Sequence, residues 1–258
     1  MEYNNLLVDV KDEIAVVTIN RPKQMNALNQ ETLKELEDAF SSFYNNDGIK
    51  GVILTGSGDK AFVAGADIKE FSDYDKKQGK QMADYGHHVY NVIENCPKPV
   101  VAAVNGFALG GGCELTMACH LRVASENAKF SQPEVNLGII PGYGGTQRMT
   151  RLIGKTKAME LLMTADMINA KQAETFGLIN YVTSLDELMD KAFELLNKIK
   201  TKSPMAIRHL INSVNGYYNA PDGFEVERQE FSNCFETADF KEGTSAFMEK
   251  RKAAFTGK

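Results

Sequence analysis

The stretch NGFALGGGCEL, residues 105–115, places three consecutive glycines directly before an apolar run that contains one acid, Glu114. The residues before it, KPVVAAVNG, are typical of a short buried strand, and ELTMAC after the glycines predicts a helix. Glycine costs backbone entropy, so three in a row indicate either a tight, closely packed turn or a ligand that contacts bare backbone. The stretch therefore predicts a strand, a glycine turn and a helix in direct succession.

The first half of the chain continues this alternation of strands and helices. IAVVTIN (residues 14–20) and KGVILTGSG (50–58) are rich in β-branched and apolar residues, whereas 29–46 carries apolar residues at helical spacing. A polar helical stretch is expected from about residue 80 to 95, and short strands are expected at LRVAS and KFSQ. This order predicts the α/β fold class.

The second half is expected to be helical. Asn169 suits the first cap position of one helix, Ser184 and Glu187 have the spacing of a capping box, and Pro204 suits the first turn of another. No low-complexity linker separates the halves. We therefore expect one α/β domain with a helical C-terminal part.

Composition excludes several classes of protein. The 258 residues are 43% hydrophobic and 24% charged with a net charge of −5, which argues against broad nucleic-acid binding. The N-terminal residues have no signal-peptide pattern, and no apolar run approaches the ~18 residues of a membrane span. The four cysteines lack metal or CxxC spacing and indicate reduced thiols. We therefore expect a cytoplasmic protein with no membrane association and no nucleic-acid partner.

The motifs of several common active sites are missing. The sequence contains no GxSxG, no GxxxxGK[ST], and no GxGxxG after a predicted strand. None of its four histidines has a second ligand at metal spacing. We therefore expect no metal site and no redox cofactor.

Three short segments remain as candidates for chemistry: FVAGADIKEF (62–71), NGFALGGGCEL (105–115) and FSQPEVNLGIIPGYGGTQR (130–148). In the first two, small residues are expected to lead from a strand into a helix. Free backbone N–H groups at such a helix start can form an oxyanion hole, and side chains would block it. The alternative is that the glycines only permit close packing, and spacing alone does not decide between the two.

Two acids belong to these segments. Glu114 lies in an unusually apolar run, and Glu134 follows a proline 20 residues later. Two carboxylates can divide acid and base roles where their surroundings separate their pKa values. Taken alone, each residue also suits a structural role at a helix start, and the spacing does not show that the two converge.

The three segments together resemble the crotonase, or enoyl-CoA hydratase/isomerase, superfamily. The resemblance begins at TINRPKQMNAL (18–28), continues through all three segments, and ends at AFMEKRKAAF (246–255), so it covers essentially the whole chain. One departure is Val63, where many relatives have alanine before AGAD. The resemblance implies a spiral of ββα units over residues 1–200, which carries the CoA and catalytic site. It also implies a helical oligomerisation region over 201–258 that forms a homotrimer or a homohexamer built as a dimer of trimers.

The resemblance also implies roles for individual residues. The oxyanion hole matches the backbone N–H groups of Ala66 and Gly111, the two catalytic glutamates match Glu114 and Glu134, and Gly142 matches the glycine that orients water. The residues that match the CoA contacts are Lys23, Ala64, Ala66, Asp67, Ile68 and Lys69, with Phe247 and Lys250 directed at a neighbouring subunit's CoA.

The implied activity is reversible syn-hydration of a trans-2-enoyl-CoA to a 3-hydroxyacyl-CoA, a hydro-lyase reaction with short-chain substrates such as crotonyl-CoA. The resemblance implies no metal and no separate cofactor, because coenzyme A is part of the substrate. Glu134 is expected to act as the acid at Cα, and Glu114 to help activate water. The alternatives are a double-bond isomerase of the same fold, which usually needs one carboxylate, and a non-catalytic acyl-CoA- or RNA-binding member. The presence of both acids favours the hydratase.

Overall fold

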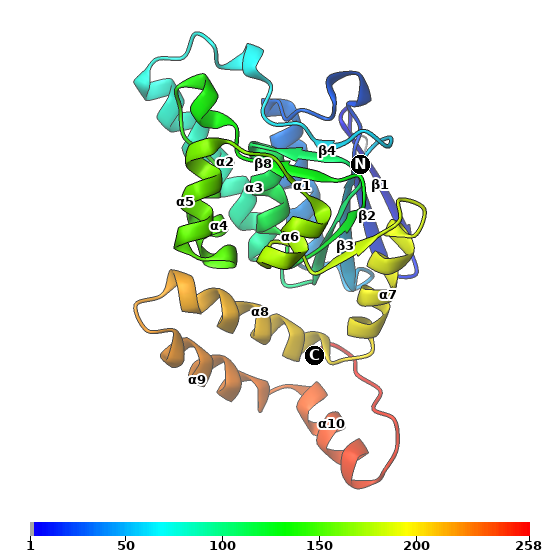
Figure 1. The fold of residues 1–258 in the computed structure, drawn as a ribbon. Helices are drawn as coiled ribbons and strands as arrows, with labels where there is room; N and C mark the ends of the chain where they lie inside the picture. The colour runs from blue at the N-terminus through cyan, green and yellow to red at the C-terminus, as the bar shows by residue number, and fades with distance from the viewer. Residues whose placement is uncertain (1–2) are drawn as a thin grey trace.

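Two β-sheets form the centre of the protein, in a computed structural model that describes residues 3–258 (Figure 1). The larger sheet has the strand order β1-β2-β3-β5-β7-β10, and the smaller has the order β4-β6-β8-β9. The strands are β1 (Leu6–Lys11), β2 (Ile14–Ile19), β3 (Gly51–Gly56), β4 (Ala61–Val63), β5 (Val100–Val104), β6 (Phe107–Leu109), β7 (Leu121–Ser125), β8 (Lys129–Ser131), β9 (Ile168–Asn169) and β10 (Tyr181–Thr183).

Three successive units of the chain stack on one another. Each unit contributes one strand to the larger sheet and the next strand to the smaller one, so β3, β5 and β7 pair in parallel, as do β4, β6 and β8. A helical segment follows each pair before the chain returns to the larger sheet. This arrangement is the predicted α/β spiral of ββα units.

This stacking brings distant parts of the sequence to one edge of the smaller sheet. The carboxyl ends of neighbouring parallel strands lie at the same edge, with about 4.8 Å between strands. The segments that leave the ends of β4, β6 and β8 therefore emerge side by side. These are the three segments singled out from the sequence.

The helices surround the two sheets. They are α1 (Gln30–Phe43), α2 (Lys76–Glu94), α3 (Gly111–Ala118), α4 (Gly145–Ile153), α5 (Lys155–Thr164), α6 (Ala170–Phe176), α7 (Leu188–Lys200), α8 (Pro204–Asn219), α9 (Gly223–Cys234) and α10 (Ala238–Met248), with short 3-10 helices at η1 (Pro22–Gln24), η2 (Ile68–Glu70) and η3 (Glu134–Leu137). Helix α7 buries Leu188, Ala192 and Leu196 in a cluster with residues of the larger sheet, including Ile53 and Val101.

Several helix ends follow the sequence and others do not. Asn169 caps α6 and Pro204 begins α8, as predicted. Helix α2 begins earlier than predicted, because Asp75 forms a capping box with Gln78. The capping box predicted at Ser184 is wrong. Its hydroxyl donates to the side chain of Glu187, no backbone amide is capped, and α7 begins only at Leu188.

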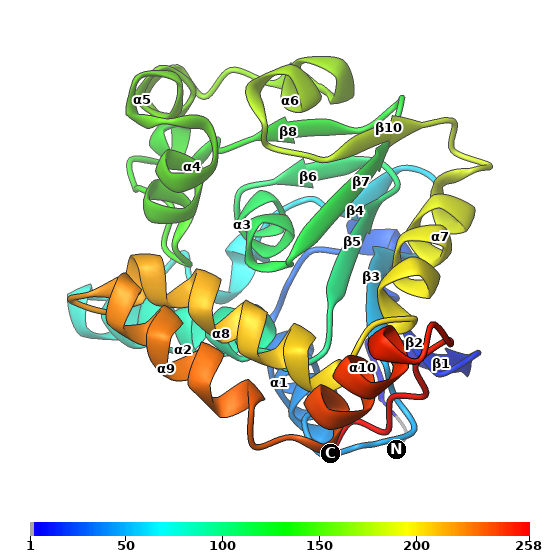
Figure 2. The same cartoon turned by 90° about the horizontal axis from the view of Figure 1, so that it is seen from below.

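Helices α8, α9 and α10 lie at one end of the molecule, away from most of the sheet core (Figures 1 and 2). This region exposes large apolar side chains: Leu210, Val214, Tyr217, Phe224, Phe231, Phe235, Phe247 and Met248. Contiguous exposed apolar surface usually marks an interaction site. Within residues 3–258, no helix has the length and apolar character needed to cross a membrane.

Candidate active site

One cavity of about 990 Å³ adjoins the segments that leave the smaller sheet, and it brings together the five residues expected to carry the chemistry. Its walls include Ala66 after β4, Gly111 and Glu114 in the first turn of α3, Glu134 after β8, and Gly142 in the following loop. Much of the remaining wall is apolar and comes from α2 and from residues 137–141. The structure therefore joins residues that are up to 76 positions apart in the sequence.

Each of the three consecutive glycines meets a different surrounding. Gly110 has a φ of +48°, and a Cβ there would lie 2.6 Å from Oε1 of Glu134. A Cβ on Gly112 would lie 2.0 Å from the carbonyl oxygen of Val63, so close packing on β4 excludes any side chain. A Cβ on Gly111 would lie 3.6 Å from the backbone nitrogen of Ala66, at an ordinary contact distance. Packing thus explains Gly110 and Gly112, whereas Gly111 leaves a space beside Ala66 open.

The amides of Ala66 and Gly111 belong to residues that line the cavity. Neither donates a hydrogen bond to another group within residues 3–258. On either side of Ala66, the carbonyl of Gly65 accepts from the amide of Leu28, and the amide of Asp67 donates to the carbonyl of Leu28. Ala66 forms an isolated parallel bridge with Leu28. The expected helix after this loop is the short η2, which begins two residues later at Ile68. The carbonyl of Gly111 accepts a hydrogen bond of 2.6 Å from the hydroxyl of Tyr90, which ties the first turn of α3 to α2.

Glu114 is almost fully buried, with 1% of its surface exposed. Its Oε1 accepts hydrogen bonds from the backbone amides of Tyr143, at 2.8 Å, and Gly145, at 2.6 Å. Both amides belong to the start of α4, where free N–H groups and the helix dipole favour a negative charge. Burial raises the pKa of Glu114 to about 7, and the nearby charge of Glu134 adds to this, while the two amides oppose it.

Glu134 begins η3 and is 9% exposed. Burial raises its pKa to about 7 as well. The buried side chain of Gln132 flanks the carboxylate. With its amide nitrogen turned toward Glu134, it lies 3.2 Å from each oxygen. The backbone amide of Glu134 itself opposes this rise in pKa.

Helix α4 is anchored to α2 by a buried ion pair. The guanidinium of Arg148 lies 2.6 Å from Glu94 and donates to the carbonyl of Tyr143 at 2.8 Å. A Cβ on Gly144, which has a φ of +103°, would lie 2.4 Å from the same guanidinium. This contact holds the turn that presents the amides of Tyr143 and Gly145 to Glu114.

Sequence reasoning missed several of these contributors. The sequence predicts a helical second half, but no signal connects the GGTQR segment (144–148) to Glu114. Tyr90 and Gln132 carried no signal either, because their roles depend on contacts between distant segments.

The residues matched to CoA contacts divide into two groups. Ala64, Ala66 and Ile68 line the cavity, whereas Asp67 lies beside it and pairs with Arg21 at 3.2 Å. The remaining residues do not line it: Lys23, Lys69, Phe247 and Lys250. All four are exposed, and Phe247 on α10 has 86% of its surface exposed. Within residues 3–258, no group of three or more His, Cys, Asp or Glu side chains is arranged to hold a metal ion.

Comparisons with known proteins agree with this site. The family model described as enoyl-CoA hydratase/isomerase matches residues 9–258. The chain is 46% identical to a short-chain-enoyl-CoA hydratase of Clostridium acetobutylicum, over 98% of this chain and 97% of the relative. It is also 46% identical to a crotonyl-CoA hydratase of Syntrophomonas wolfei over the full length of both.

Solved structures agree as well. The crystal structure of an enoyl-CoA hydratase from Bacillus anthracis superimposes with a TM-score of 0.92 at 37% identity, covering 99% of this chain and 100% of that one. A structure from Geobacillus kaustophilus gives a TM-score of 0.93 at 38% identity, with both chains fully covered. On the sequence match, the fold and the cavity together, this chain belongs to the enoyl-CoA hydratase/isomerase family.

Proposed function

We propose that this protein catalyses the reversible syn-hydration of trans-2-enoyl-CoA thioesters to 3-hydroxyacyl-CoA, with short chains such as crotonyl-CoA as its substrates. One observation carries the proposal: two free backbone amides and two buried carboxylates line the same cavity. The names of the two relatives at 46% identity support both the reaction and the short chain length.

The amides of Ala66 and Gly111 are the proposed oxyanion hole. Attack of water at Cβ of the enoyl group moves negative charge onto the thioester oxygen. Two oriented N–H donors in a site that excludes water stabilise this charge, and one such donor contributes roughly 10²–10³ in rate. Their free state and the open space beside Gly111 support this role.

The two glutamates are proposed to divide the proton transfers. Glu114 as a carboxylate removes a proton from water while the water oxygen bonds to Cβ, and Glu134 as a carboxylic acid gives its proton to Cα. The two amide donors on Glu114 support its ionised form, and burial supports the neutral form of Glu134. After addition Glu114 carries the proton and Glu134 the charge, so dehydration uses the reverse roles. Gly142 is proposed to help position the water.

Binding of the CoA moiety is proposed to use Lys23, Ala64 and residues 66–69 of one subunit. Phe247 and Lys250 are proposed to contact the CoA of a neighbouring subunit, because both are exposed and neither lines the cavity of its own chain. The exposed apolar side chains of α8–α10 support a homotrimer or a dimer of trimers. Apart from the CoA of the substrate, the proposed reaction uses only groups of this chain.

The decisive experiment follows the hydration of crotonyl-CoA by the purified protein. We expect saturable conversion to 3-hydroxybutyryl-CoA, and loss of about 10²–10⁴ in kcat for both Glu114→Gln and Glu134→Gln. Parallel assays with 3-enoyl-CoA test the isomerase, and binding of acyl-CoA without turnover would indicate a non-catalytic member. Full hydration by either variant would contradict the assignment of two carboxylates.

A further inference from the structure

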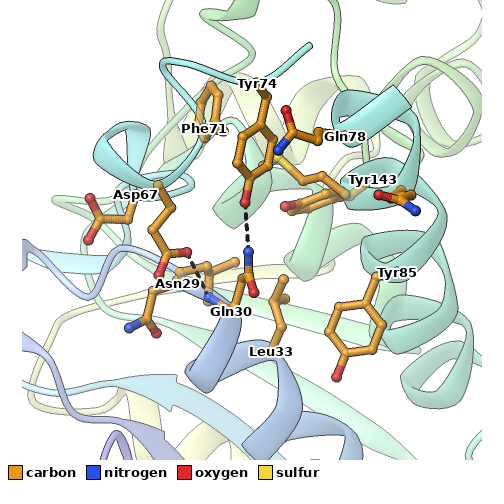
Figure 3. Close-up of a pocket in the computed structure, with 13 residues that line it drawn as sticks. Asn29, Gln30, Leu33, Asp67, Phe71, Tyr74, Gln78, Tyr85 and Tyr143 are labelled. Atoms are coloured by element: carbon orange, nitrogen blue, oxygen red, sulfur yellow. Dashed lines mark hydrogen bonds between the residues drawn. The ribbon is translucent and has the colours of Figure 1, made fainter. Parts of the chain in front are cut away.

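A second cavity of about 330 Å³ lies next to the catalytic cavity. It lies between the start of α1, the segment after η2 and helix α2, and is partly open to solvent (Figure 3). Part of its wall is not shared with the catalytic cavity and includes Leu28, Leu33 and Tyr85. Its volume corresponds to roughly ten water molecules of the liquid, so it has room for several methylene groups.

Four residues form a wall shared by the two cavities: Phe71, Tyr74, Met82 and Tyr143. Tyr143 is 5% exposed and packs edge-on against Tyr90, so it belongs to the fixed core of the site. Phe71, Tyr74 and Met82 are only partly buried. The movable part of the wall therefore lies on the segment after η2 and on α2.

A pair of hydrogen bonds holds this part of the wall in place (Figure 3). The side-chain nitrogen of Gln30, the first residue of α1, donates to the hydroxyl of Tyr74 at 2.7 Å. The backbone amide of Gln30 donates to Glu70 at 2.8 Å. The helix start of α1 thus ties down the chain segment that carries Tyr74, 44 residues away.

We propose that Tyr74, held by Gln30, is the wall that limits the length of the acyl chain, and that the second cavity is the space a longer chain would enter if Tyr74 were moved. This inference rests on the proposed function. An acyl group whose thioester lies between Ala66 and Gly111 has its Cβ near Glu114, whose Oε1 accepts a hydrogen bond from the backbone amide of Tyr143. Tyr143 lines both cavities. The carbons beyond Cβ then meet the shared wall, so short chains fit and longer ones collide with Tyr74. Tyr74 is the specificity-determining residue, and Gln30 is a positioning residue that acts through it.

The test measures kcat/KM for trans-2-enoyl-CoA substrates with four and ten carbons. Tyr74→Ala removes the wall, Tyr74→Phe keeps the ring without the hydroxyl, and Gln30→Ala removes only the donor. We expect the ratio of ten-carbon to four-carbon kcat/KM to rise about tenfold or more in Tyr74→Ala, and by a smaller factor in the other two, mainly through KM. Tyr181→Phe, which changes a tyrosine on β10 outside both cavities, is the matched control and should keep the wild-type ratio.

A double-mutant cycle separates positioning from a general structural effect. In the Tyr74→Phe background, Gln30→Ala should not change the ratio further, because the hydrogen bond is already absent. An unchanged ratio in folded Tyr74→Ala and Gln30→Ala would overturn the inference. Failure of the wild-type protein to hydrate crotonyl-CoA would instead overturn the proposed function, so the two failures are distinguishable.

Discussion

The Oε1 atom of Glu114 lies 2.6 Å from the backbone nitrogen of Gly145, and this contact joins the first turn of α3 to the start of α4. It places a buried carboxylate at the N-terminus of a helix that does not carry it. A Cβ on Gly145 would lie 2.9 Å from the same Oε1 atom, so the position requires glycine. The contact favours the ionised form of Glu114 against the effect of burial, which is the form the proposed reaction requires.

Alanine substitutions of two glycines at the start of α3 should have different effects, one on activity and the other on folding. Gly111→Ala places a methyl group 3.6 Å from the nitrogen of Ala66, where we expect the thioester oxygen to bind. The variant should fold with a Tm close to that of the wild-type protein and lose about 10² or more in kcat/KM. Gly112→Ala, whose methyl group would lie 2.0 Å from the carbonyl of Val63, should instead lower Tm strongly or prevent folding. Thermal unfolding and hydration assays on both variants check this contrast, and a fully active Gly111→Ala would contradict it.

Gly142 offers a second test of the open space. A Cβ built there meets no atom within 4 Å, so Gly142→Ala should leave stability unchanged. Because the residue lines the catalytic cavity, the added methyl group should interfere with the proposed water position and lower kcat more than it raises KM. Steady-state kinetics with crotonyl-CoA measures the changes in kcat and KM separately. Gly48→Ala, at an exposed turn outside the cavity where the added methyl group would meet only the end of the Asn46 side chain, is the control.

The pH dependence of activity should be bell-shaped. The proposed reaction needs one ionised and one neutral glutamate, and burial raises the pKa of both Glu114 and Glu134 to about 7. Activity should therefore fall when both are protonated below neutral pH and when both are ionised above it. Measuring kcat/KM for crotonyl-CoA from about pH 5 to about pH 9 checks the shape. A profile that stays flat over this range would contradict a pair of titrating carboxylates.

Stability should depend on pH in the opposite sense from that of an ordinary paired carboxylate. A pKa raised from 4.5 to about 7 in the folded state means that folding favours protonated Glu134. Its contribution is fully present below pH 4.5 and is lost as the pH rises through about 7, by an amount equivalent to roughly 3 kcal/mol. Glu134→Gln should remove this loss, so its Tm should exceed that of the wild-type protein above pH 8. Glu126→Gln, an exposed carboxylate outside the cavity, is the control, and equal Tm differences at low and high pH would contradict the prediction.

Assembly can be tested by light scattering. The exposed apolar side chains on α8–α10 should be covered in a trimer or a dimer of trimers. Phe247→Asp should therefore raise KM for the CoA substrate by removing a contact to a neighbouring subunit, with little change in the monomer's secondary structure. A wild-type protein that is monomeric at micromolar concentration would rule out the shared binding site.

Local sequence pattern was sufficient for β2, β3, β5, β7 and β8 and for most helices, whereas β1 and the short strands β4, β6, β9 and β10 were not predicted. Strand β3, helix α3 and the cap at Asn169 follow from apolar spacing and turn chemistry over a few residues. Assigning Glu114 and Glu134 a joint role depended on family resemblance, because they lie on different elements. The donors that hold Glu114 could not be predicted, since Tyr143 and Gly145 lie 29 and 31 residues away and meet it only in the folded chain. The bond between Gln30 and Tyr74 is likewise a product of tertiary packing.

The stacked ββα units give each part of the site its own origin in the chain. Ala66, Gly111 and Glu134 follow three neighbouring strands of one sheet, and each is reached through a separate loop. A loop after one strand can therefore change in length or sequence while the other two groups keep their positions. The chemistry and the substrate preference of this architecture can evolve separately, one loop at a time, on an unchanged scaffold.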